Sequence, residues 1–212
     1  MRKKMIELLT ANTPNGKKIS IMLEEINFDY KVTKININKD EQFKPEFKKL
    51  SPFSKIPVII DHDNNQSLFE SGAILIYLAE KSGKFYSKQN RTLINQWLMG
   101  QMAYVGPMLG QHHQFHHYNP GKSEFGESRY FKIAKKIYEE LNERLSISRF
   151  LAGEEYSIAD IATFPWIARH EWHDIGLKNY KNLSNWYEEI SLRKAVIKGF
   201  DILNKGEKIP KT

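Results

Sequence analysis

The turn Thr13-Pro14-Asn15-Gly16 places a hydroxyl group and a carboxamide between a short apolar stretch, Met5–Leu9, and a helix. The helix is indicated by apolar residues at i, i+3, i+4 and i+7: Ile19, Met22, Leu23 and Ile26. A helix N-terminus carries partial positive charge, and both side chains can donate hydrogen bonds, so the turn suits an anion. Thr and Asn are also ordinary cap and turn residues, and the residue types alone leave both interpretations open.

A second candidate site is Glu70-Ser71-Gly72, which stands directly before a helical apolar pattern. The free N–H groups and the dipole at the start of a helix favour an anion. Ser71 suits a carboxylate there, and Glu70 suits an ammonium group. The alternative is that Ser71 only caps the helix and that Glu70 is solvated.

Four histidines gather in the stretch HHQFHH, where His112 and His116, and likewise His113 and His117, are spaced i, i+4. Each pair faces one side of a helix and has the spacing of metal ligands. No carboxylate follows at a companion spacing, however. We therefore favour a structural or pocket-lining role for this cluster, and we expect no metal.

The elements that position these residues alternate in type over residues 1–83. The patterns predict the order β-α-β-α-β-β-α, with these segments: Met5–Leu9, Gly16–Ile26, Tyr30–Ile37, a short helix around Phe47, Ile56–Ile60, Ser67–Phe69, and a helix ended by Gly83. The first two strands, joined by a helix, are expected to be parallel, and the last two antiparallel.

Beyond the polar connection 82–90, the sequence has no pattern typical of strands, and only helices are expected. Their ranges are 91 to about 117, about 124–147, 158–170, 182–190 and 193–203. Gly106-Pro107 is expected to kink or interrupt the first of them. Ser157 and Asp160 form an S-x-x-D capping box at the start of a buried helix. We predict an α/β domain over 1–82, a linker over 83–90 and an all-α domain over 91–212.

Composition limits the function classes. The chain has 212 residues, 41% of them hydrophobic, which suits one large domain or two modest ones. Its net charge of +7 comes from basic residues interleaved with acidic ones, so we expect no nucleic-acid partner. No apolar run approaches the ~20 residues of a membrane span, so we expect no membrane contact and a cytoplasmic location. Cysteine is absent, so any reactive sulfur must arrive with a ligand.

The order of these motifs resembles the cytosolic glutathione transferase superfamily. The tetrad TPNG, followed by QFKPEF, SPFSKIPVI, LFESGAILIYLAEKSG and GPMLGQ, is similar to the nu-class subgroup, the bacterial glutathione-dependent disulfide-bond oxidoreductases. The resemblance covers about residues 5–200. It implies a thioredoxin-like N-terminal domain, an all-helical C-terminal domain of the glutathione-transferase type, and a homodimer.

The resemblance also implies roles for particular residues toward glutathione as cosubstrate. Thr13 and Asn15 would be the catalytic donors that hold the glutathione sulfur as a thiolate. The Ile56-Pro57 bond would be cis, so that the backbone of Ile56 pairs with the cysteinyl backbone of glutathione. Glu70 and Ser71 would bind its γ-glutamyl end.

Two further glutathione contacts, Gln42 and Arg129, are expected only because of the resemblance, since each would otherwise be read as a surface polar residue. The activity it implies is thiol–disulfide exchange, in which a bound glutathione thiolate attacks a small disulfide and a second glutathione resolves the mixed disulfide. The alternatives are conjugation of glutathione to electrophiles and a non-catalytic interaction module.

Overall fold

A computed structural model describes residues 5–212, which form two compact units. The first unit runs to Lys84 and resumes over Arg193–Lys208, and the second comprises Phe85–Leu192 and Ile209–Thr212. The C-terminal helix therefore packs with the first unit. This differs from the expected division, which assigned all of 91–212 to one helical domain, because hydrophobic periodicity marks a helix without identifying the surface that it covers.

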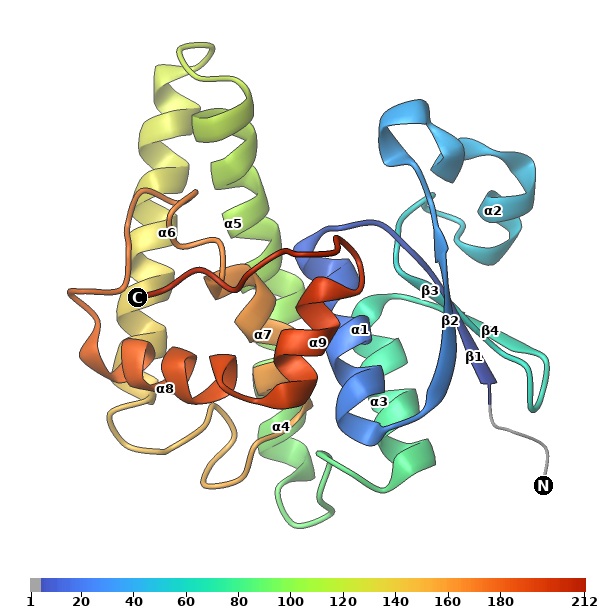
Figure 1. The fold of residues 1–212 in the computed structure, drawn as a ribbon. Helices are drawn as coiled ribbons and strands as arrows, with labels where there is room; N and C mark the ends of the chain where they lie inside the picture. Colours follow the sequence, from blue (N-terminus) through green and yellow to red (C-terminus); the bar gives the residue numbers. More distant parts are fainter. Residues whose placement is uncertain (1–4) are drawn as a thin grey trace. The chain divides into compact units, whose positions relative to one another are not determined.

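The first unit contains one four-stranded sheet in the order β2-β1-β3-β4 (Figure 1). Its strands are β1 (Met5–Thr10), β2 (Asp29–Lys34), β3 (Val58–Asp61) and β4 (Gln66–Phe69). As predicted, β1 and β2 are parallel and β3 and β4 are antiparallel. The second strand ends at Lys34, before the predicted Ile37, because Asn36 caps a short 3₁₀ helix, η1 (Ile37–Lys39).

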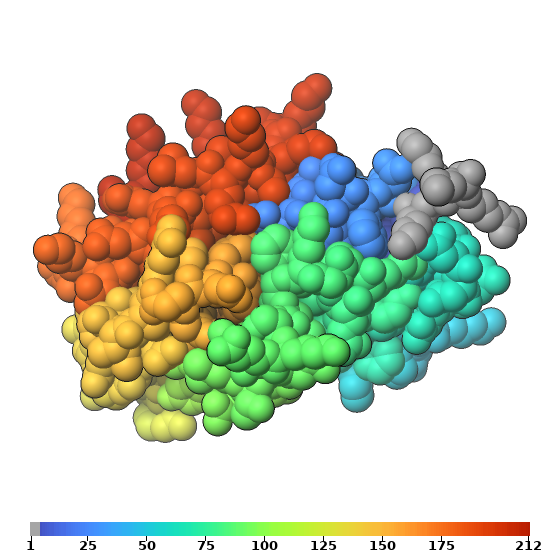
Figure 2. Space-filling view, turned by 90° about the horizontal axis from the view of Figure 1, so that it is seen from below, coloured from blue at the N-terminus to red at the C-terminus, as the bar shows by residue number. Residues whose placement is uncertain are grey.

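Helices α1 (Pro14–Ile26) and α3 (Ser71–Ser82) cover one face of this sheet, and α2 (Pro45–Leu50) lies on the other side (Figure 1). Helix α9 (Lys194–Asp201) lies beside α1, and in Figure 2 the red C-terminal residues abut the blue N-terminal ones. The two helices approach closely because Gly199 has no side chain: a Cβ there would lie 2.6 Å from the Cα of Ile21. Helix α1 is therefore buried on two sides.

The second unit is built from helices alone apart from an isolated β-bridge. In chain order they are α4 (Arg91–Gly100), η3 (Gln101–Val105), α5 (Gly106–His112), η4 (His113–Tyr118), α6 (Glu124–Arg144), α7 (Ile158–Ile167) and α8 (Lys181–Ser191). The predicted helix 91–117 is thus interrupted by a π-helical segment, η3, that ends where Gly106-Pro107 begins. Within residues 5–212, no helix is long and apolar enough to cross a membrane.

The predicted capping box starts α7. Asp160 is fully buried, and its carboxylate accepts hydrogen bonds from the backbone N–H of Ser157 (3.0 Å), from that of Leu151 (2.9 Å) and from the indole of Trp186 (2.9 Å). Burial raises the pKa of Asp160, and these hydrogen bonds act in the opposite direction. One carboxylate therefore ties α7 to the preceding loop and to α8.

Candidate functional site

Four segments that carry predicted residues leave the sheet at one end. In the register of the strands, Leu9 pairs with Val58, Val58 pairs with Phe69, and Thr10 pairs with Lys34. Four segments therefore start or end at neighbouring positions: the turn after β1, the segment after β2, the loop before β3 and the turn after β4. The sheet brings the start of α1, the start of α3 and the residue before Pro57 to one edge.

Thr13 is the N-cap of α1. Its hydroxyl oxygen accepts a hydrogen bond from the backbone N–H of Gly16 at 3.1 Å, and Pro14 occupies the first helical position, for which its ring is suited. Because a hydroxyl is both an acceptor and a donor, this bond leaves the Thr13 proton to donate elsewhere. Asn15 follows in the first turn and is partly exposed. Capping therefore does not exclude a second role for Thr13.

Gly16 is required by the close approach of the chain to itself. A Cβ at this position would lie 2.5 Å from the hydroxyl oxygen of Thr10 and closer still to the carbonyl oxygen of Ala11. Any side chain would push α1 away from the end of β1. The glycine of the tetrad thus fixes where the helix N-terminus stands.

The loop before β3 is closed by the buried hydroxyl of Ser51, which accepts from the N–H of Lys55 (3.1 Å) and donates to its carbonyl (2.8 Å). The Ile56-Pro57 bond that follows is cis, as the resemblance implied. The side chain of Ile56 packs against the core cluster that includes Leu9 and Val58. Ile56 is therefore fixed in place by its own side chain.

Glu70 and Ser71 form the N-terminus of α3. Glu70 is the N-cap residue and is exposed, whereas only 5% of Ser71 is exposed. The backbone of Glu70 has φ 69° and ψ 113°, a region that residues other than glycine rarely adopt. Such a conformation costs about 1–3 kcal/mol and is concentrated at functional sites.

Lys18 is a residue of this region that the sequence analysis missed. It lies on α1, is only 1% exposed, and its ammonium nitrogen is 3.4 Å from the hydroxyl oxygen of Ser71. Burial lowers the pKa of Lys18 well below its ordinary value, while the negative charge of Glu70 acts to raise it. A sequence signal existed: Lys18 stands four residues before Met22, on the apolar face of the helix.

Gln42 and Arg129 lie in different units. Gln42 belongs to a 3₁₀ turn, η2 (Glu41–Phe43), and its amide nitrogen donates to the carbonyl of Ile37 at 3.4 Å. Its buried amide oxygen has no hydrogen-bond partner among residues 5–212. Arg129 is exposed on α6 of the second unit. The sheet edge thus gathers the predicted residues at the starts of α1 and α3 and the residue before Pro57. Gln42 lies farther along the segment after β2, and Arg129 belongs to the other unit.

The histidine cluster forms stacked rings inside the second unit. The rings of His112 and His116 stack with centroids 4.7 Å apart, and those of His113 and His173 with centroids 4.6 Å apart. His173 also shares a 2.7 Å hydrogen bond with the hydroxyl of Tyr138. Throughout the described part of the chain, no three His, Cys, Asp or Glu side chains are placed to hold a metal ion.

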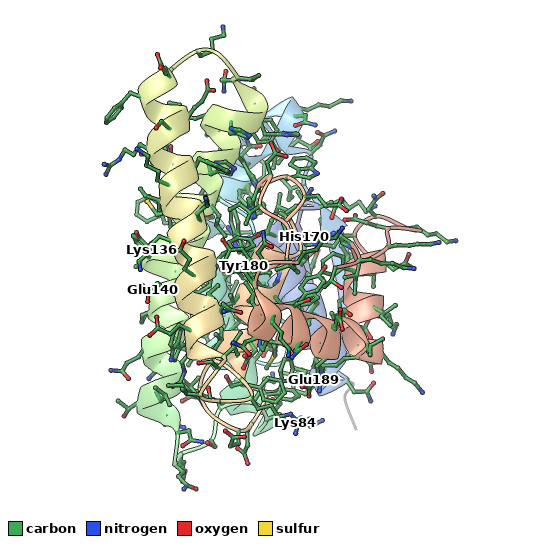
Figure 3. The ribbon with its side chains drawn as sticks, turned by 90° about the vertical axis from the view of Figure 1, so that its left-hand side faces the viewer. Lys84, Lys136, Glu140, His170, Tyr180 and Glu189 are labelled. Atoms are coloured by element: carbon green, nitrogen blue, oxygen red, sulfur yellow. The ribbon has the colours of Figure 1, made fainter. Side chains whose placement is uncertain are left out.

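The buried histidines of this unit, His112, His113, His170 and His173, have lowered pKa values. Burial, with the nearby charge of Arg169 as a second cause, lowers the pKa of His113 to about 3. Burial also lowers the pKa values of His173 and His170. Figure 3 shows His170 and Tyr180 on the inner side of α6. Lys136 and Glu140 lie on the opposite, exposed side of this helix, where the ammonium nitrogen of Lys136 is 2.6 Å from a carboxylate oxygen of Glu140.

Comparisons with known proteins agree on one family. The model of the glutathione S-transferase N-terminal domain matches residues 6–80, and that of the C-terminal domain matches residues 112–194. The disulfide-bond oxidoreductase YfcG of Escherichia coli is 46% identical over 198 residues, covering 90% of this chain and 92% of the relative. A second one, YghU, is 36% identical and covers 92% of this chain and 73% of its own length.

Solved structures agree in fold. A glutathione transferase of Burkholderia graminis with two glutathione molecules bound per subunit has a TM-score of 0.88 at 36% identity, covering 95% of this chain and 90% of that one. A glutathione transferase of Pseudomonas putida with one glutathione disulfide bound per subunit has a TM-score of 0.86 at 39% identity, covering 93% and 91% of the two chains.

Proposed function

Since this chain belongs to the glutathione S-transferase family, we propose that it is a glutathione-dependent thiol–disulfide oxidoreductase that reduces small disulfides. The observation that carries the proposal is the start of α1, where two side-chain donors, Thr13 and Asn15, meet a helix N-terminus in a chain without cysteine. Donors arranged in this way stabilise a thiolate, and the sulfur has to be that of a ligand.

Glutathione is proposed to bind along the sheet edge. The γ-glutamyl carboxylate suits the hydroxyl of Ser71 and the N–H groups at the start of α3, and the γ-glutamyl ammonium suits the exposed carboxylate of Glu70. The backbone of Ile56, next to the cis bond, suits the cysteinyl backbone. Gln42 completes the proposed set of contacts in the first unit, and a contact of Arg129 with glutathione stays a prediction from the family resemblance. In this placement, the cysteinyl sulfur is near the start of α1.

The proposed role of Thr13 and Asn15 is to keep that sulfur ionised. A free thiol has a pKa of about 8.5 and is mostly protonated at neutral pH, whereas the thiolate is the attacking species. The Thr13 hydroxyl, which already accepts from Gly16, donates its own proton toward the sulfur. The N–H groups of the first turn add positive potential, so that the pKa of the bound thiol is lowered.

The proposed reaction has two exchange steps. The bound glutathione thiolate attacks one sulfur of a disulfide, forming a mixed disulfide and releasing the other sulfur as a thiolate that takes up a proton. A second glutathione thiolate then attacks the glutathione sulfur of the mixed disulfide, giving glutathione disulfide and a second free thiol. Two glutathione molecules are oxidised and one disulfide is reduced, with no metal in either step.

Conjugation of glutathione to an electrophile is the second candidate function, because the same thiolate would carry it out and because both matching domain models are those of glutathione S-transferases. The test is a direct comparison of the purified protein acting on bis(2-hydroxyethyl) disulfide and on 1-chloro-2,4-dinitrobenzene, each with glutathione. We expect faster turnover of the disulfide. Turnover of the aromatic chloride alone would support the second candidate and contradict the first.

A homodimer in the cytoplasm is part of the proposal. Phe53 is 70% exposed and Phe69 37% exposed, and their rings meet edge to face at 6.5 Å. An exposed aromatic pair supports an interaction surface, and the reaction needs the glutathione pool that keeps cytosolic thiols reduced. Light scattering is expected to give the mass of a dimer, and Phe53→Ser is expected to shift it toward a monomer.

A further inference from the structure

Helix α9 runs antiparallel to α1, so the segment that follows α9 reaches the start of α1 (Figure 1). At one end of this helix pair, Arg193 forms two hydrogen bonds with the carboxylate of Glu25, at 2.6 and 2.9 Å. At the other end, Leu203 lies against Gly16, since a Cβ on the glycine would be 3.4 Å from a methyl carbon of Leu203. The turn that carries Thr13 therefore has C-terminal residues of the same unit packed against it.

Glu207, which follows α9, contacts the residues on both sides of this turn. One of its carboxylate oxygens accepts a hydrogen bond from the side-chain amide of Asn12 at 2.7 Å, and the other forms an ion pair with Lys17. Asn12 directly precedes Thr13, and Lys17 directly follows Gly16. A single carboxylate thus holds the chain just before and just after the tetrad TPNG.

The position and the charge of Glu207 are themselves fixed. Its backbone N–H donates to the carbonyl of Asn204 at 2.9 Å, and the N–H of Gly206 donates to the carboxylate of Asp201 at 2.6 Å. Burial acts to raise the pKa of Glu207, but the ion pair with Lys17 and the hydrogen bonds lower this pKa overall. The carboxylate is therefore ionised at neutral pH, and ionised acceptors form the stronger hydrogen bonds.

We propose that Glu207 is a positioning residue for thiol–disulfide exchange, acting through Asn12 and Lys17 to hold the donors of the turn at the glutathione sulfur. This inference rests on the proposed function and adds to it a residue from the C-terminal end of the first unit. The role is geometric, because a displacement of about 1 Å in a group that acts on the reacting atoms can cost roughly a hundredfold in rate.

Position and charge predict opposite changes at the sulfur. A negative carboxylate near the start of α1 disfavours a thiolate there, so loss of the Glu207 charge alone should lower the pKa of the bound thiol. Loss of the position should raise that pKa, since Thr13 and Asn15 then donate less well to the sulfur. The sign of the change therefore identifies the role of Glu207.

Asn12→Ala is the main test, because it removes one contact of Glu207 without changing any charge, at an exposed residue. The pKa of glutathione bound to the protein is measured from the ultraviolet absorbance of its thiolate against pH, and kcat and KM from disulfide reduction. The pKa should rise by about one unit, and kcat at neutral pH should fall by up to about tenfold with the thiolate fraction. The KM for glutathione should change much less than kcat.

Glu207→Gln tests the charge. Glutamine keeps hydrogen-bonding groups toward Lys17 and toward Asn12, whose amide can turn to match it, so the pKa of the bound thiol should stay at or below that of the natural protein. Arg193→Met is the matched control, because it breaks the ion pair with Glu25 at the far end of the same helix pair. It should lower the melting temperature and leave the pKa of the bound thiol unchanged.

An unchanged or lowered pKa of the bound thiol in Asn12→Ala would overturn this inference alone. An equal rise in Arg193→Met would overturn it as well, because any loosening of the helix pair would then have the same effect. Failure of the natural protein to reduce the disulfide with glutathione would instead overturn the proposed function.

Discussion

At the scale of single residues, the start of α1 makes a prediction about the sulfur. Asn15→Ala should impair disulfide reduction more than glutathione binding, because the proposed contacts of Ile56, Glu70 and Ser71 are untouched. Loss of a donor should raise the pKa of the bound thiol, and each unit corresponds to ~1.4 kcal/mol between thiol and thiolate. The measurement is the rate of disulfide reduction against pH, for the natural protein and for the variant.

The rate of Asn15→Ala should recover at alkaline pH, because a thiolate of higher pKa is intrinsically more nucleophilic, with a Brønsted slope of about 0.4–0.5. Thr13→Ser is the control, since it keeps the cap and the hydroxyl, and its profile should follow that of the natural protein. Superimposable profiles for Asn15→Ala and the natural protein at equal affinity would mean that Asn15 does not activate the sulfur.

Glu70 makes a second prediction, because its backbone conformation and its charge have opposite effects. Glu70→Gly should raise the free energy of unfolding by about 1 kcal/mol, since glycine adopts φ 69° without strain. The same variant should weaken glutathione binding by about 1–3 kcal/mol, through loss of a hydrogen bond to a charged group. Urea unfolding and calorimetry check the two effects.

Glu70→Ala separates the two effects of the glycine variant. It removes the carboxylate but keeps a Cβ, so it should weaken binding to a similar extent without the gain in stability. If Glu70→Gly leaves both the stability and the affinity unchanged, then the backbone of Glu70 is not strained and its carboxylate does not bind the γ-glutamyl ammonium of glutathione.

At the scale of elements, the contact between α1 and α9 makes a third prediction. A Cβ at Gly199 would lie 2.6 Å from the Cα of Ile21, so Gly199→Val should force the helices apart and destabilise the fold by about 1–3 kcal/mol. Gly100→Ala is the matched control: nothing lies within 4 Å of a Cβ there, and it should stabilise α4 by up to ~1 kcal/mol. Thermal unfolding of both variants is the measurement, and equal melting temperatures would contradict the close packing.

The sequence predicted the helices and strands better than it predicted the packing around them. The order of helices and strands along the first unit and the capping box of Ser157 and Asp160 follow from local periodicity and spacing, and both were predicted. The burial of Lys17 was not, because it depends on α9, which is distant in sequence. The burial of Lys18 was missed although this residue stands on the apolar face of α1. The cis state of the Ile56-Pro57 bond came from the family resemblance, since most X-Pro bonds are trans.

At the scale of the whole molecule, the buried histidines predict that stability falls in acid. The pKa of His113 is lowered from 6.5 to about 3 in the folded state, so the unfolded chain binds more protons between these values. The free energy of unfolding should therefore decrease as the pH falls below 6.5, by up to ~1.4 kcal/mol per pH unit for this residue. His173 and His170 add to the effect in the same direction.

The measurement for the histidines is urea unfolding at pH 7.5 and at pH 5.5, followed by tryptophan fluorescence. Trp172 and Trp166 stack on His117 and His113, so the signal reports this cluster directly. His113→Phe should reduce the pH dependence, because phenylalanine fills the ring position without titrating. A pH dependence equal to that of the natural protein would show that His113 is not held neutral by the fold.

Because α9 completes the first unit, the order of synthesis matters for folding. When Lys84 has been synthesised, the sheet, α1 and α3 are already complete, but the helix that covers the second side of α1 starts only at Lys194. At roughly 5–20 residues per second, the intervening stretch takes about 5–20 s to synthesise. During that interval Ile21 and Lys17 lack their covering helix, so the nascent chain presents a surface suited to chaperones that bind exposed apolar segments.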